Sequence, residues 1–235
     1  MPKKIRRIVT LSTIIILASL GSVLITLFPY LPSALSSPIK PVILYYDYEN
    51  LPFNTSQFPT IVQTTLQHHF NTLMVLVYFD HRLLFNQSTL DYFYSYARTE
   101  NLTFVPSYYV ESLSDKFNVS GFSWVNLDME KIAPNVQRFV YAETLAQGSP
   151  LVSITSPYGQ PVEFGTSLDI LETYSGTPWF WFLQLGYWHA GHICSIAPWT
   201  LHSQQEYDSE KNYCTKYTEG LMVFDYYNLL KSHLN

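Results

Sequence analysis

The chain has 235 residues and a formal net charge of −5, with charged residues at only 13% and aromatic residues at 17%. Abundant apolar and aromatic residues beside few charges exclude a disordered chain and predict a folded domain with a large core. The acidic balance, without a basic stripe to neutralise phosphates, argues against binding to nucleic acid.

The N-terminus has the pattern of a membrane anchor. Residues 8–31 are uncharged and mostly apolar, and they follow a basic cluster formed by Lys3, Lys4, Arg6 and Arg7. A bilayer span needs about 20 such residues, whereas the core of a signal peptide has about 7–15. Because basic residues stay in the cytoplasm, we expect a cytoplasmic segment 1–7, a transmembrane anchor 8–31, a linker 32–41 and an extracellular domain 42–235. Cleavage at the small residues of 34–36 is the alternative and gives a secreted protein.

Four glycosylation sequons lie beyond the hydrophobic N-terminus, and their acceptors are Asn54, Asn86, Asn101 and Asn118. Single sequons arise often by chance, but four in segments predicted as loops or helix ends are harder to dismiss. They support an extracellular domain and predict a membrane-tethered glycoprotein.

Segments typical of strands and helices alternate along the domain. Apolar runs predict strands at 41–46, 72–79, 102–105, 123–129, 150–154 and 220–226, and 179–183 is a candidate for another. Helices are predicted over 59–70 and 227–234, behind a Ser88 cap, and from Pro134 to a stop at Gly148. From Gln160 onward the pattern degrades, and the strand expected before 179–183 is not evident.

Continuous apolar strands separated by amphipathic helices are typical of a parallel sheet buried on both faces. The first prediction is an α/β fold, a (β/α)8 TIM-barrel-like domain behind one N-terminal transmembrane helix. An open doubly wound sheet is the alternative.

The run 123–130, SWVNLDME, places polar residues at alternate positions of a predicted strand. Because successive strand side chains point to opposite faces, Asn126, Asp128 and Glu130 share one face. Acids about 7 Å apart on a strand repel each other, which raises the pKa of one of them. A carboxyl group that keeps its proton near neutral pH is what general acid catalysis needs. The alternative is a strand end with two solvated acids.

These residues resemble the Asp-Gly-x-Asp-x-Asp-x-Glu motif that ends the fourth barrel strand of family 18, chitinase-type glycoside hydrolases. Asp128 and Glu130 match the motif, whereas Ser123, Trp124 and Asn126 stand where the family has Asp, Gly and Asp. The resemblance implies that Glu130 protonates the glycosidic oxygen. It also implies that Asp128 orients a substrate acetamido group, which acts as an internal nucleophile. We expect Asn126 to be a hydrogen-bond partner in this site and to contribute to substrate binding. The run 220–226 resembles the closing strand of such barrels, with Phe224 where the family has a Trp under the sugar.

Further acids end other predicted strands, and we expect them at the same mouth of a barrel, where they bind substrate. They are Asp47, Glu49, Asp80 and Asp225. If the substrate lacks an acetamido group, a second carboxylate must act about 5 Å from Glu130 as nucleophile, or at about 6.5–9.5 Å as base. Asp225, Asp47 and Glu49 are the candidates. The alternative is that acids follow strands because loops are polar.

Two cysteines and nearby histidines leave several interpretations. A disulfide between Cys194 and Cys214 would close a loop of about 20 residues and contribute about 3 kcal/mol. Alternatively, His189, His192 and Cys194 have a spacing that suits zinc or copper. A third interpretation places Trp188 and the two histidines in a sugar subsite.

Together these patterns predict a membrane-anchored extracellular glycoside hydrolase-like protein that cleaves glycosidic bonds in polysaccharide or glycoprotein glycans. The alternative is a catalytically inactive glycan-binding or cell-surface interaction glycoprotein, since fold does not fix function. The sequence has no P-loop, dinucleotide fingerprint, Gly-x-Ser-x-Gly elbow or His-Glu-x-x-His helix, so no cofactor and no metal are expected. The expected partners are a carbohydrate substrate and the membrane.

Overall fold

The computed structural model describes residues 39–47, 53–129, 131–148, 151–156, 168–171 and 192–234. These residues lie in one compact unit that extends over Lys40–Asn235, with residue 39 just before it. The predicted anchor 8–31 lies outside the described residues. In the described part of the chain, no helix has the length and apolar character needed to cross a membrane.

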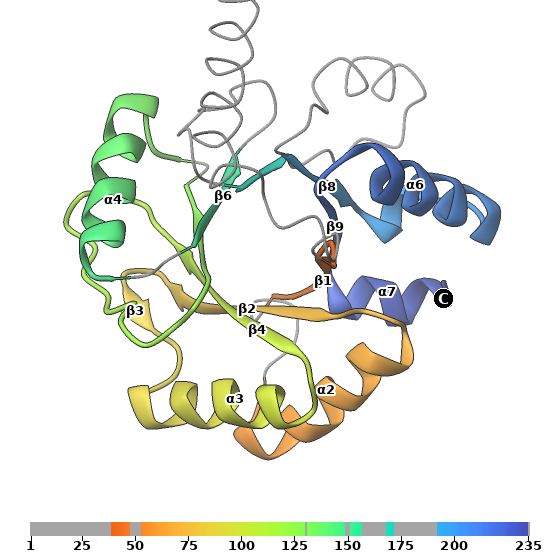
Figure 1. Cartoon of the computed structure of the whole chain (residues 1–235), viewed down its shortest axis with the longest axis horizontal. Coiled ribbons are helices and arrows are strands. Elements are labelled where there is room, and N and C mark those ends of the chain that lie inside the picture. The colour runs from red at the N-terminus through yellow and green to blue at the C-terminus, as the bar shows by residue number, and fades with distance from the viewer. Residues whose placement is uncertain are drawn as a thin grey trace, which may run out of the picture. The chain divides into compact units, whose positions relative to one another are not determined.

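The described strands form one sheet of nine, and eight of them run parallel in a ring (Figure 1). In the order of the chain these eight are β1 Val42–Tyr46, β2 Thr72–Phe79, β4 Thr103–Tyr109, β5 Val125–Asp128, β6 Val152–Ser156, β7 Leu168–Leu171, β8 His192–Ile196 and β9 Gly220–Phe224. Each pairs in parallel with the next, and β1 pairs with both β2 and β9, which closes the ring. The short β3, Arg82–Leu83, is antiparallel to β2. The predicted α/β, barrel-like architecture is therefore confirmed, and the pairing of β1 with β9 rules out the open doubly wound alternative.

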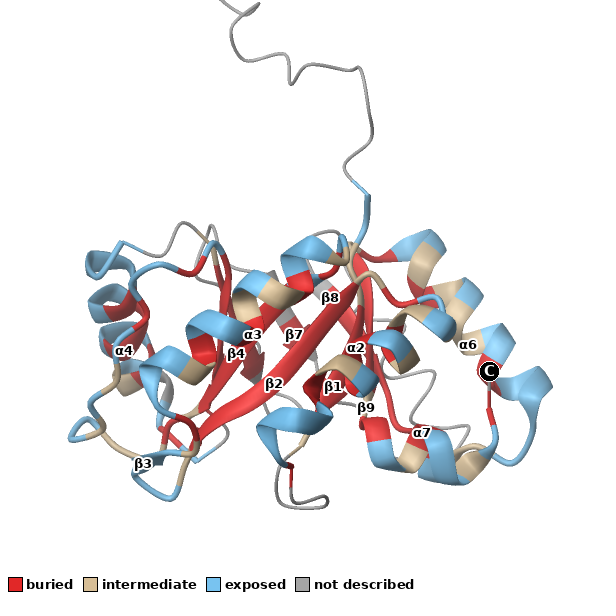
Figure 2. Ribbon diagram, turned by 90° about the horizontal axis from the view of Figure 1, so that it is seen from below, coloured by how far each residue is buried: buried red, intermediate tan, exposed pale blue. Residues whose placement is uncertain are grey.

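Helices follow the strands and pack outside the ring, with their buried faces toward the strands (Figure 2). They are α2 Phe58–Gln67, α3 Gln87–Thr99, α4 Pro134–Ala146, α6 Gln204–Tyr217 and α7 Tyr226–Ser232, with 3-10 turns η2 Thr55–Gln57 and η3 Pro198–Thr200. Asn86, and not the predicted Ser88, caps α3, because its Oδ1 accepts a hydrogen bond from the Thr89 amide at 2.9 Å. Gly148 follows the end of α4 with φ +92°, a conformation that glycine adopts without strain.

The second half of the ring was predicted less well than the first. The strands β7 and β8 and the helix α6 were missed, and the segment 179–183 lies outside the described residues. The seventh strand of the ring is β8, whose residues are predicted above as part of a metal-binding or sugar-binding loop. Each missed strand is short, with the sequences LDIL and HICSI, and α6 buries only Tyr207 and Cys214. Patterns this short or this polar do not reach the length that periodicity needs.

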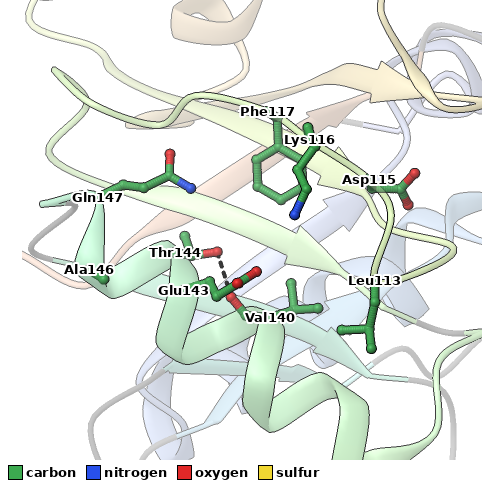
Figure 3. A pocket seen from close by; sticks show the side chains of 9 residues that line it. All are labelled: Leu113, Asp115, Lys116, Phe117, Val140, Glu143, Thr144, Ala146 and Gln147. Carbon is green, nitrogen blue, oxygen red and sulfur yellow. Dashed lines mark hydrogen bonds between the residues drawn. The ribbon is translucent and has the colours of Figure 1, made fainter.

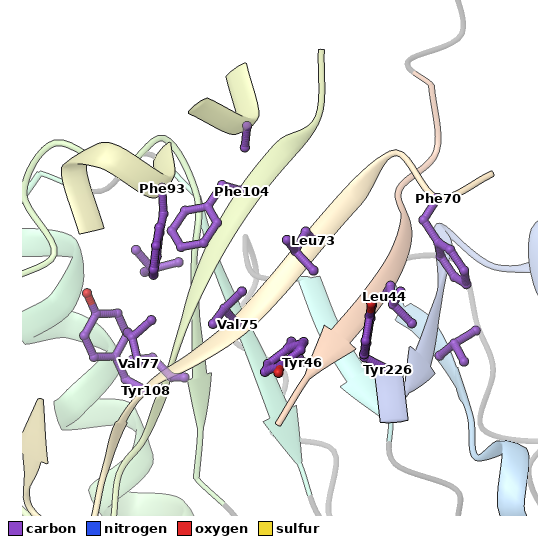
Figure 4. Close-up of a cluster of buried hydrophobic side chains, with 14 of the residues drawn as sticks. Leu44, Tyr46, Phe70, Leu73, Val75, Val77, Phe93, Phe104, Tyr108 and Tyr226 are labelled. Atoms are coloured by element: carbon purple, nitrogen blue, oxygen red, sulfur yellow. The ribbon is translucent and has the colours of Figure 1, made fainter. Parts of the chain in front are cut away.

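Buried apolar side chains form two clusters on the two faces of the strands. The larger one joins strands to helices and includes the labelled side chains of Figure 4, among them Leu73, Phe93 and Tyr226. The smaller cluster consists of residues on or directly beside the strands: Ile43, Tyr45, Met74, Leu76, Val105, Trp124, Ile170, Ile193 and Met222. Because these side chains come from all round the ring and include no helix residue, they fill its interior.

The predicted disulfide is present and joins Cys194 on β8 to Cys214 on α6, with their Cα atoms 5.5 Å apart. Both cysteines are fully buried in the cluster between strands and helices. The bond ties a strand of the ring to the helix that covers it.

Candidate functional site at the mouth of the ring

Asp128 lies inside the ring at its mouth, the end where the parallel strands terminate. It is the last residue of β5, and it shares its face of the strand with Trp124, whose side chain packs in the interior cluster. Its neighbours in register are Tyr109 on β4 and Thr155 on β6. With 6% of its surface exposed, Asp128 is a buried acid held between two strands. Glu130, the predicted general acid, lies outside the described residues.

Below Asp128, the interior on the β4–β6 side is a closed network of polar side chains. Asn126 Nδ2 donates hydrogen bonds to Ser107 Oγ and Thr155 Oγ1, each at 2.9 Å. Ser153 Oγ donates to Asn126 Oδ1 at 2.8 Å and accepts from Trp124 Nε1 at 2.9 Å. The amide of Asn126 therefore bonds the neighbouring strands, because both of them present hydroxyl groups at its level. None of these bonds involves Asp128, and the predicted role of Asn126 in the site stays a prediction.

On the β1–β9–β8 side, aromatic side chains lie at the ends of the strands near the mouth. Tyr45 on β1 stacks on Phe224 of β9, with ring centroids 4.9 Å apart and planes 21° apart. Trp199, in the η3 turn directly after β8, packs against Phe224 at 5.7 Å and 74°, an edge-to-face contact. We call Tyr45, Phe224 and Trp199 the aromatic wall. Exposure rises along it, from 4% for Tyr45 to 45% for Trp199.

The order of the strands places the aromatic wall opposite the acid. In the sequence of pairings, β9 is four steps from β5 whichever way the ring is followed. Phe224 ends β9 and Asp128 ends β5, so both lie at the mouth and on opposite sides of it. Aromatic rings therefore lie on one side of the mouth and a carboxylate on the other.

A cluster of charged and polar side chains borders the mouth where β2 and β4 end. Asp115 lies in the loop after β4, and one of its carboxylate oxygens accepts from His81 Nδ1 at 2.5 Å and from the Tyr78 hydroxyl at 3.1 Å. The other oxygen accepts from the backbone amides of Glu111 and Ser112 at 2.8 and 2.9 Å. Asp115 therefore fixes the start of the β4–β5 loop and joins it to the turn after β2.

These contacts shift the pKa values of the groups involved. Burial acts to raise the pKa of Asp115, but the hydrogen bonds from His81, from the two amides and from Tyr78 outweigh it and lower that pKa. The hydrogen bond to Asp115 and the charge of its carboxylate raise the pKa of His81 above its ordinary value. Burial and the same carboxylate raise the pKa of Tyr78 to about 12.

Lys131 continues this cluster toward Asp128. Its Nζ lies 3.3 Å from Glu111 Oε1 and 5.2 Å above the centre of the Tyr109 ring. Tyr109 in turn packs against Phe79 at 5.4 Å. The residue that follows Glu130 is thus held by an ion pair and a cation–π contact at the edge of the mouth.

The other predicted acids lie at strand ends, but in different environments. Asp47 follows β1 and is half-buried, whereas Asp80 is exposed at the β2–β3 turn with φ 51°. Asp225 is buried and forms the N-cap of α7, where its Oδ1 accepts from the Asn228 amide at 2.8 Å. Glu49 lies outside the described residues. The convergence of these acids on one substrate stays a prediction.

The structure describes only part of the motif formed by His189, His192 and Cys194. Trp188 and His189 lie outside the described residues, whereas His192 begins β8 and does not lie in a loop as predicted. The sulfur of Cys194 is bonded to Cys214, so it is not available as a thiolate ligand. Among the described residues, no group of three or more metal-ligating side chains occurs.

All four predicted glycosylation acceptors, Asn54, Asn86, Asn101 and Asn118, are exposed. Asn54 and Asn86 also act as N-caps, of η2 and of α3. Glycosylation of these side chains stays a prediction.

A cavity of about 340 Å³ lies outside the ring, between α4 and the β4–β5 loop (Figure 3). Lys116 and Phe117 cover one side of it, and Glu143 and Thr144 of α4 form another. Asp115 is the one lining residue that also belongs to the cluster at the mouth. Since Asp128 does not line this cavity, we place the candidate site at the mouth.

Neither Trp199 nor the cluster around Asp115 is predicted from the sequence. Trp199 follows a strand that was itself missed, although the run Pro198-Trp199-Thr200 has the form of a turn. Asp115 closes the segment Ser112-Leu113-Ser114-Asp115, whose serine and aspartate are typical turn residues that bond nearby amides. Such a signal indicates the turn but not the contact with His81, which depends on the ring.

No family model and no curated protein matches the sequence. Comparison of the fold finds the GH18 chitinase ChiB from the chitin utilization locus of Flavobacterium johnsoniae, with a TM-score of 0.52 and 11% identity over 82% of this chain and 89% of that one. Two weaker likenesses have TM-scores of 0.49. They are the pneumococcal exo-beta-D-N-acetylglucosaminidase StrH with its tandem GH20 catalytic modules (8% identity, over 80% of this chain and 78% of that one) and the spore cortex-lytic enzyme SleL of Bacillus megaterium QM B1551 (10%, 85% and 76%). The likeness to the chitinase shows that the chain has a glycoside hydrolase-like fold.

Proposed function

We propose that the chain is a glycoside hydrolase of the chitinase type, family 18, which cleaves glycosidic bonds in polysaccharide or glycoprotein glycans. The observation that carries the proposal is the position of Asp128, buried inside the ring at the end of β5 and two residues before Glu130. The motif resemblance assigns this place to the acid that assists the substrate. The glycoside hydrolase-like fold agrees with it.

In the proposed reaction Glu130 donates a proton to the glycosidic oxygen while the bond from that oxygen to the anomeric carbon breaks. The acetamido oxygen of the same sugar attacks the anomeric carbon, and Asp128 orients the acetamido group and stabilises the positive charge that it gains. Water then attacks the anomeric carbon and gives a proton to Glu130, which restores both the enzyme and the acetamido group. The aromatic wall holds the sugar from the opposite side of the mouth.

A second candidate is a glycan-binding protein without catalytic activity. One observation favours it: Asn126, which stands in place of an acid of the motif, is committed to hydrogen bonds with Ser107, Ser153 and Thr155. The aromatic wall is compatible with both the glycoside hydrolase and the glycan-binding protein, because stacking on a sugar needs no acid.

The experiment that separates them uses the full-length protein in detergent, its Glu130→Gln variant and a Glu100→Gln control. Glu100 ends α3 directly before β4, so it lies at the end of the ring opposite the mouth. Each protein is incubated with chitin, peptidoglycan and neutral polysaccharides, and soluble products are measured. We expect the wild type and the Glu100→Gln control to release products, and the Glu130→Gln variant to lose at least about 10²-fold in rate. If the wild type binds a polysaccharide but releases no soluble product, the result would overturn the proposed hydrolase activity and favour the glycan-binding protein.

We also propose that residues 8–31 anchor the protein in the cell membrane, with the domain that follows outside the cell. The disulfide supports this location, because such bonds persist in oxidising compartments. When the protein is extracted from its native membrane, removal of N-linked glycans should increase its electrophoretic mobility. Asn-to-Gln changes at the four acceptors should reduce that shift in steps. Mobility that does not change would contradict the extracellular location.

A further inference from the structure

We infer that the last turns of α6, around Lys216 and Tyr217, form a surface that lies on the lipid headgroups of the membrane and so orients the domain. This contact rests on the anchor proposed above, and it does not depend on the proposed hydrolase activity. We call Lys211, Tyr213, Lys216 and Tyr217 the α6 base patch. Three features support the contact: where the domain begins, how short the linker is, and which side chains are exposed there.

The domain begins at Lys40, directly against the end of α6. Lys40 Nζ donates hydrogen bonds to the carbonyls of Thr215 and Thr218, at 3.2 and 2.5 Å. The carbonyl of Lys40 accepts from Asn71 Nδ2 at 2.9 Å. Because α6 ends just before β9 and Asn71 directly precedes β2, these contacts lie at the base of the ring, the end opposite the mouth. Lys40 therefore fixes the start of the domain beside the α6 base patch.

The linker holds this part of the domain close to the bilayer. Eight residues, 32–39, separate the proposed anchor from Lys40, and a fully extended chain of this length reaches at most about 28 Å. A compact domain of this size has a radius of gyration of about 16 Å and a diameter of about 40 Å. Since the linker is shorter than the domain, it presents the surface around Lys40 to the headgroups at a high effective concentration.

The α6 base patch exposes side chains that suit a lipid interface. Tyr217 is 52% exposed, and its ring packs on that of Tyr213 with centroids 4.8 Å apart. Lys216 is also exposed, and its Nζ lies 4.8 Å from the centre of the Tyr217 ring. Tyrosine suits the membrane interface because its ring is apolar and its hydroxyl is polar, while lysine attracts the phosphate groups of lipids.

Charge is divided along α6 in a way that favours this contact. The acids of the helix lie within 206–210, toward the mouth, whereas 211–218 contain two lysines and no acid. Lys211 also lies near His68 at the end of α2, since burial and then the charge of Lys211 lower the pKa of that histidine. Glu219, which follows, is half-buried. In a protein with a net charge of −5, a basic patch at the start of the domain has the sign that phosphate headgroups attract.

The contact lies on the α6 side of the base and does not cover the whole base. Asn101, one of the predicted glycosylation acceptors, is exposed just after α3 and also lies at the base. In the ring, α3 precedes β4 and α6 precedes β9. A glycan on Asn101 would keep the α3 side away from the lipid, so the domain stands tilted on the end of α6.

The test uses the full-length protein in vesicles of equal amounts of phosphatidylcholine and phosphatidylglycerol, with a nitroxide quencher on a fraction of the headgroups. Both native cysteines form the disulfide, so a single introduced cysteine can carry a bimane probe. Asn212→Cys places the probe one turn before Lys216. Gln205→Cys places it on the same face of α6, about 10 Å nearer the mouth, and Leu145→Cys places it at the base end of α4, across the ring.

We expect strong quenching at 212 and much weaker quenching at 205 and 145. Lys216→Gln combined with Tyr217→Ser should reduce the quenching at 212, because the loss of one lysine alone lowers the population in contact with lipid about fivefold. The matched change, Lys231→Gln with Tyr227→Ser, alters a similar exposed pair on α7, which begins at the mouth, and should have no effect. Circular dichroism checks that each variant is folded.

Equal quenching at 212 and 205, in protein that floats with the vesicles, would overturn the contact and leave the proposed anchor intact. Protein that does not float with the vesicles would overturn both. Quenching at 212 that persists after the Lys216 and Tyr217 changes would show that the linker alone brings α6 near the lipid, which would also overturn the contact.

Discussion

The two sides of the ring interior differ in chemistry, although on both sides the interior is lined by every second side chain of a strand. On the β4–β6 side, Asn126 and the hydroxyl groups around it form a buried network beneath Asp128. On the β1–β9–β8 side, Tyr45, Phe224 and Trp199 form an apolar surface whose exposure rises toward solvent. The polar half can hold an acid in place, because buried polar groups with partners are rigid, while the aromatic half offers binding surface.

A substitution at Asp128 tests whether the polar side supplies catalysis while the aromatic side supplies binding. In the proposed function the Asp128→Asn variant should lose about 10²–10³-fold in the rate of oligosaccharide hydrolysis, because a neutral amide does not stabilise the developing positive charge. Affinity for the oligosaccharide should change little, since the aromatic wall supplies it. Rates and equilibrium binding of the full-length protein are measured together, with Asp208→Asn on the exposed face of α6 as control. A variant that loses binding along with rate would show that the two halves do not act separately.

The disulfide supports the aromatic half, because Cys194 lies on the strand that leads into Trp199. Replacing both cysteines by serine should lower the free energy of unfolding by about 3 kcal/mol, the loop-entropy value for a closed loop of about 20 residues. Guanidinium unfolding of the variant and of the wild type, with and without reductant, measures the difference. Reduced wild type should behave like the variant. A loss below about 1 kcal/mol would contradict the estimate.

In the polar half, Asn126 is the residue whose loss should cost the most stability. The change Asn126→Ala leaves Ser107, Ser153 and Thr155 without their shared partner inside the ring, and we expect a loss of about 2 kcal/mol in the free energy of unfolding. The matched control is Asn212→Ala on the exposed side of α6. Urea unfolding measures both variants. Equal stabilities would show that water replaces the amide at no cost.

Local sequence patterns predict part of the polar side of the ring but not its contacts. Strand alternation placed Asn126 and Asp128 on one face, and continuous apolar runs located the strands β1 and β2, which the structure confirms. The partners of Asn126 lie on β4 and β6, and their register depends on long-range pairing that no local pattern encodes.

The aromatic half was harder to predict for a related reason. Phe224 was identified through a resemblance, but its contacts with Tyr45 and Trp199 need the closure of β1 on β9 and the position of β8. The strand β8 is short and begins with His192, so its pattern reads as a loop. Composition alone could not separate the exposed Trp199 from the many aromatic residues of the core.

The smallest expected effect concerns the border of the polar half, where His81 and Asp115 are paired. The hydrogen bond and charge of Asp115 raise the pKa of His81 above its ordinary 6.5, and Asp115 has a pKa below its ordinary 3.8 despite burial. The histidine contributes stability that is complete below pH 6.5 and is lost as the pH rises through its folded pKa. The carboxylate contributes stability that is present above pH 3.8 and is lost as the pH falls through its folded pKa, so the pair is most stabilising between these values.

An NMR titration of the His81 ring in the wild type and in Asp115→Asn measures this coupling directly. The neutral amide should lower the pKa of His81 toward 6.5, while Asp208→Asn, remote from the pair, should leave it unchanged. The loop that begins at Glu111 should also lose amide protection in Asp115→Asn, because its first two amides donate to this carboxylate. If the pKa of His81 were the same in both proteins, the contact with Asp115 would be too weak in solution to fix the loop. The edge of the mouth would then be set by Lys131 and Glu111 instead.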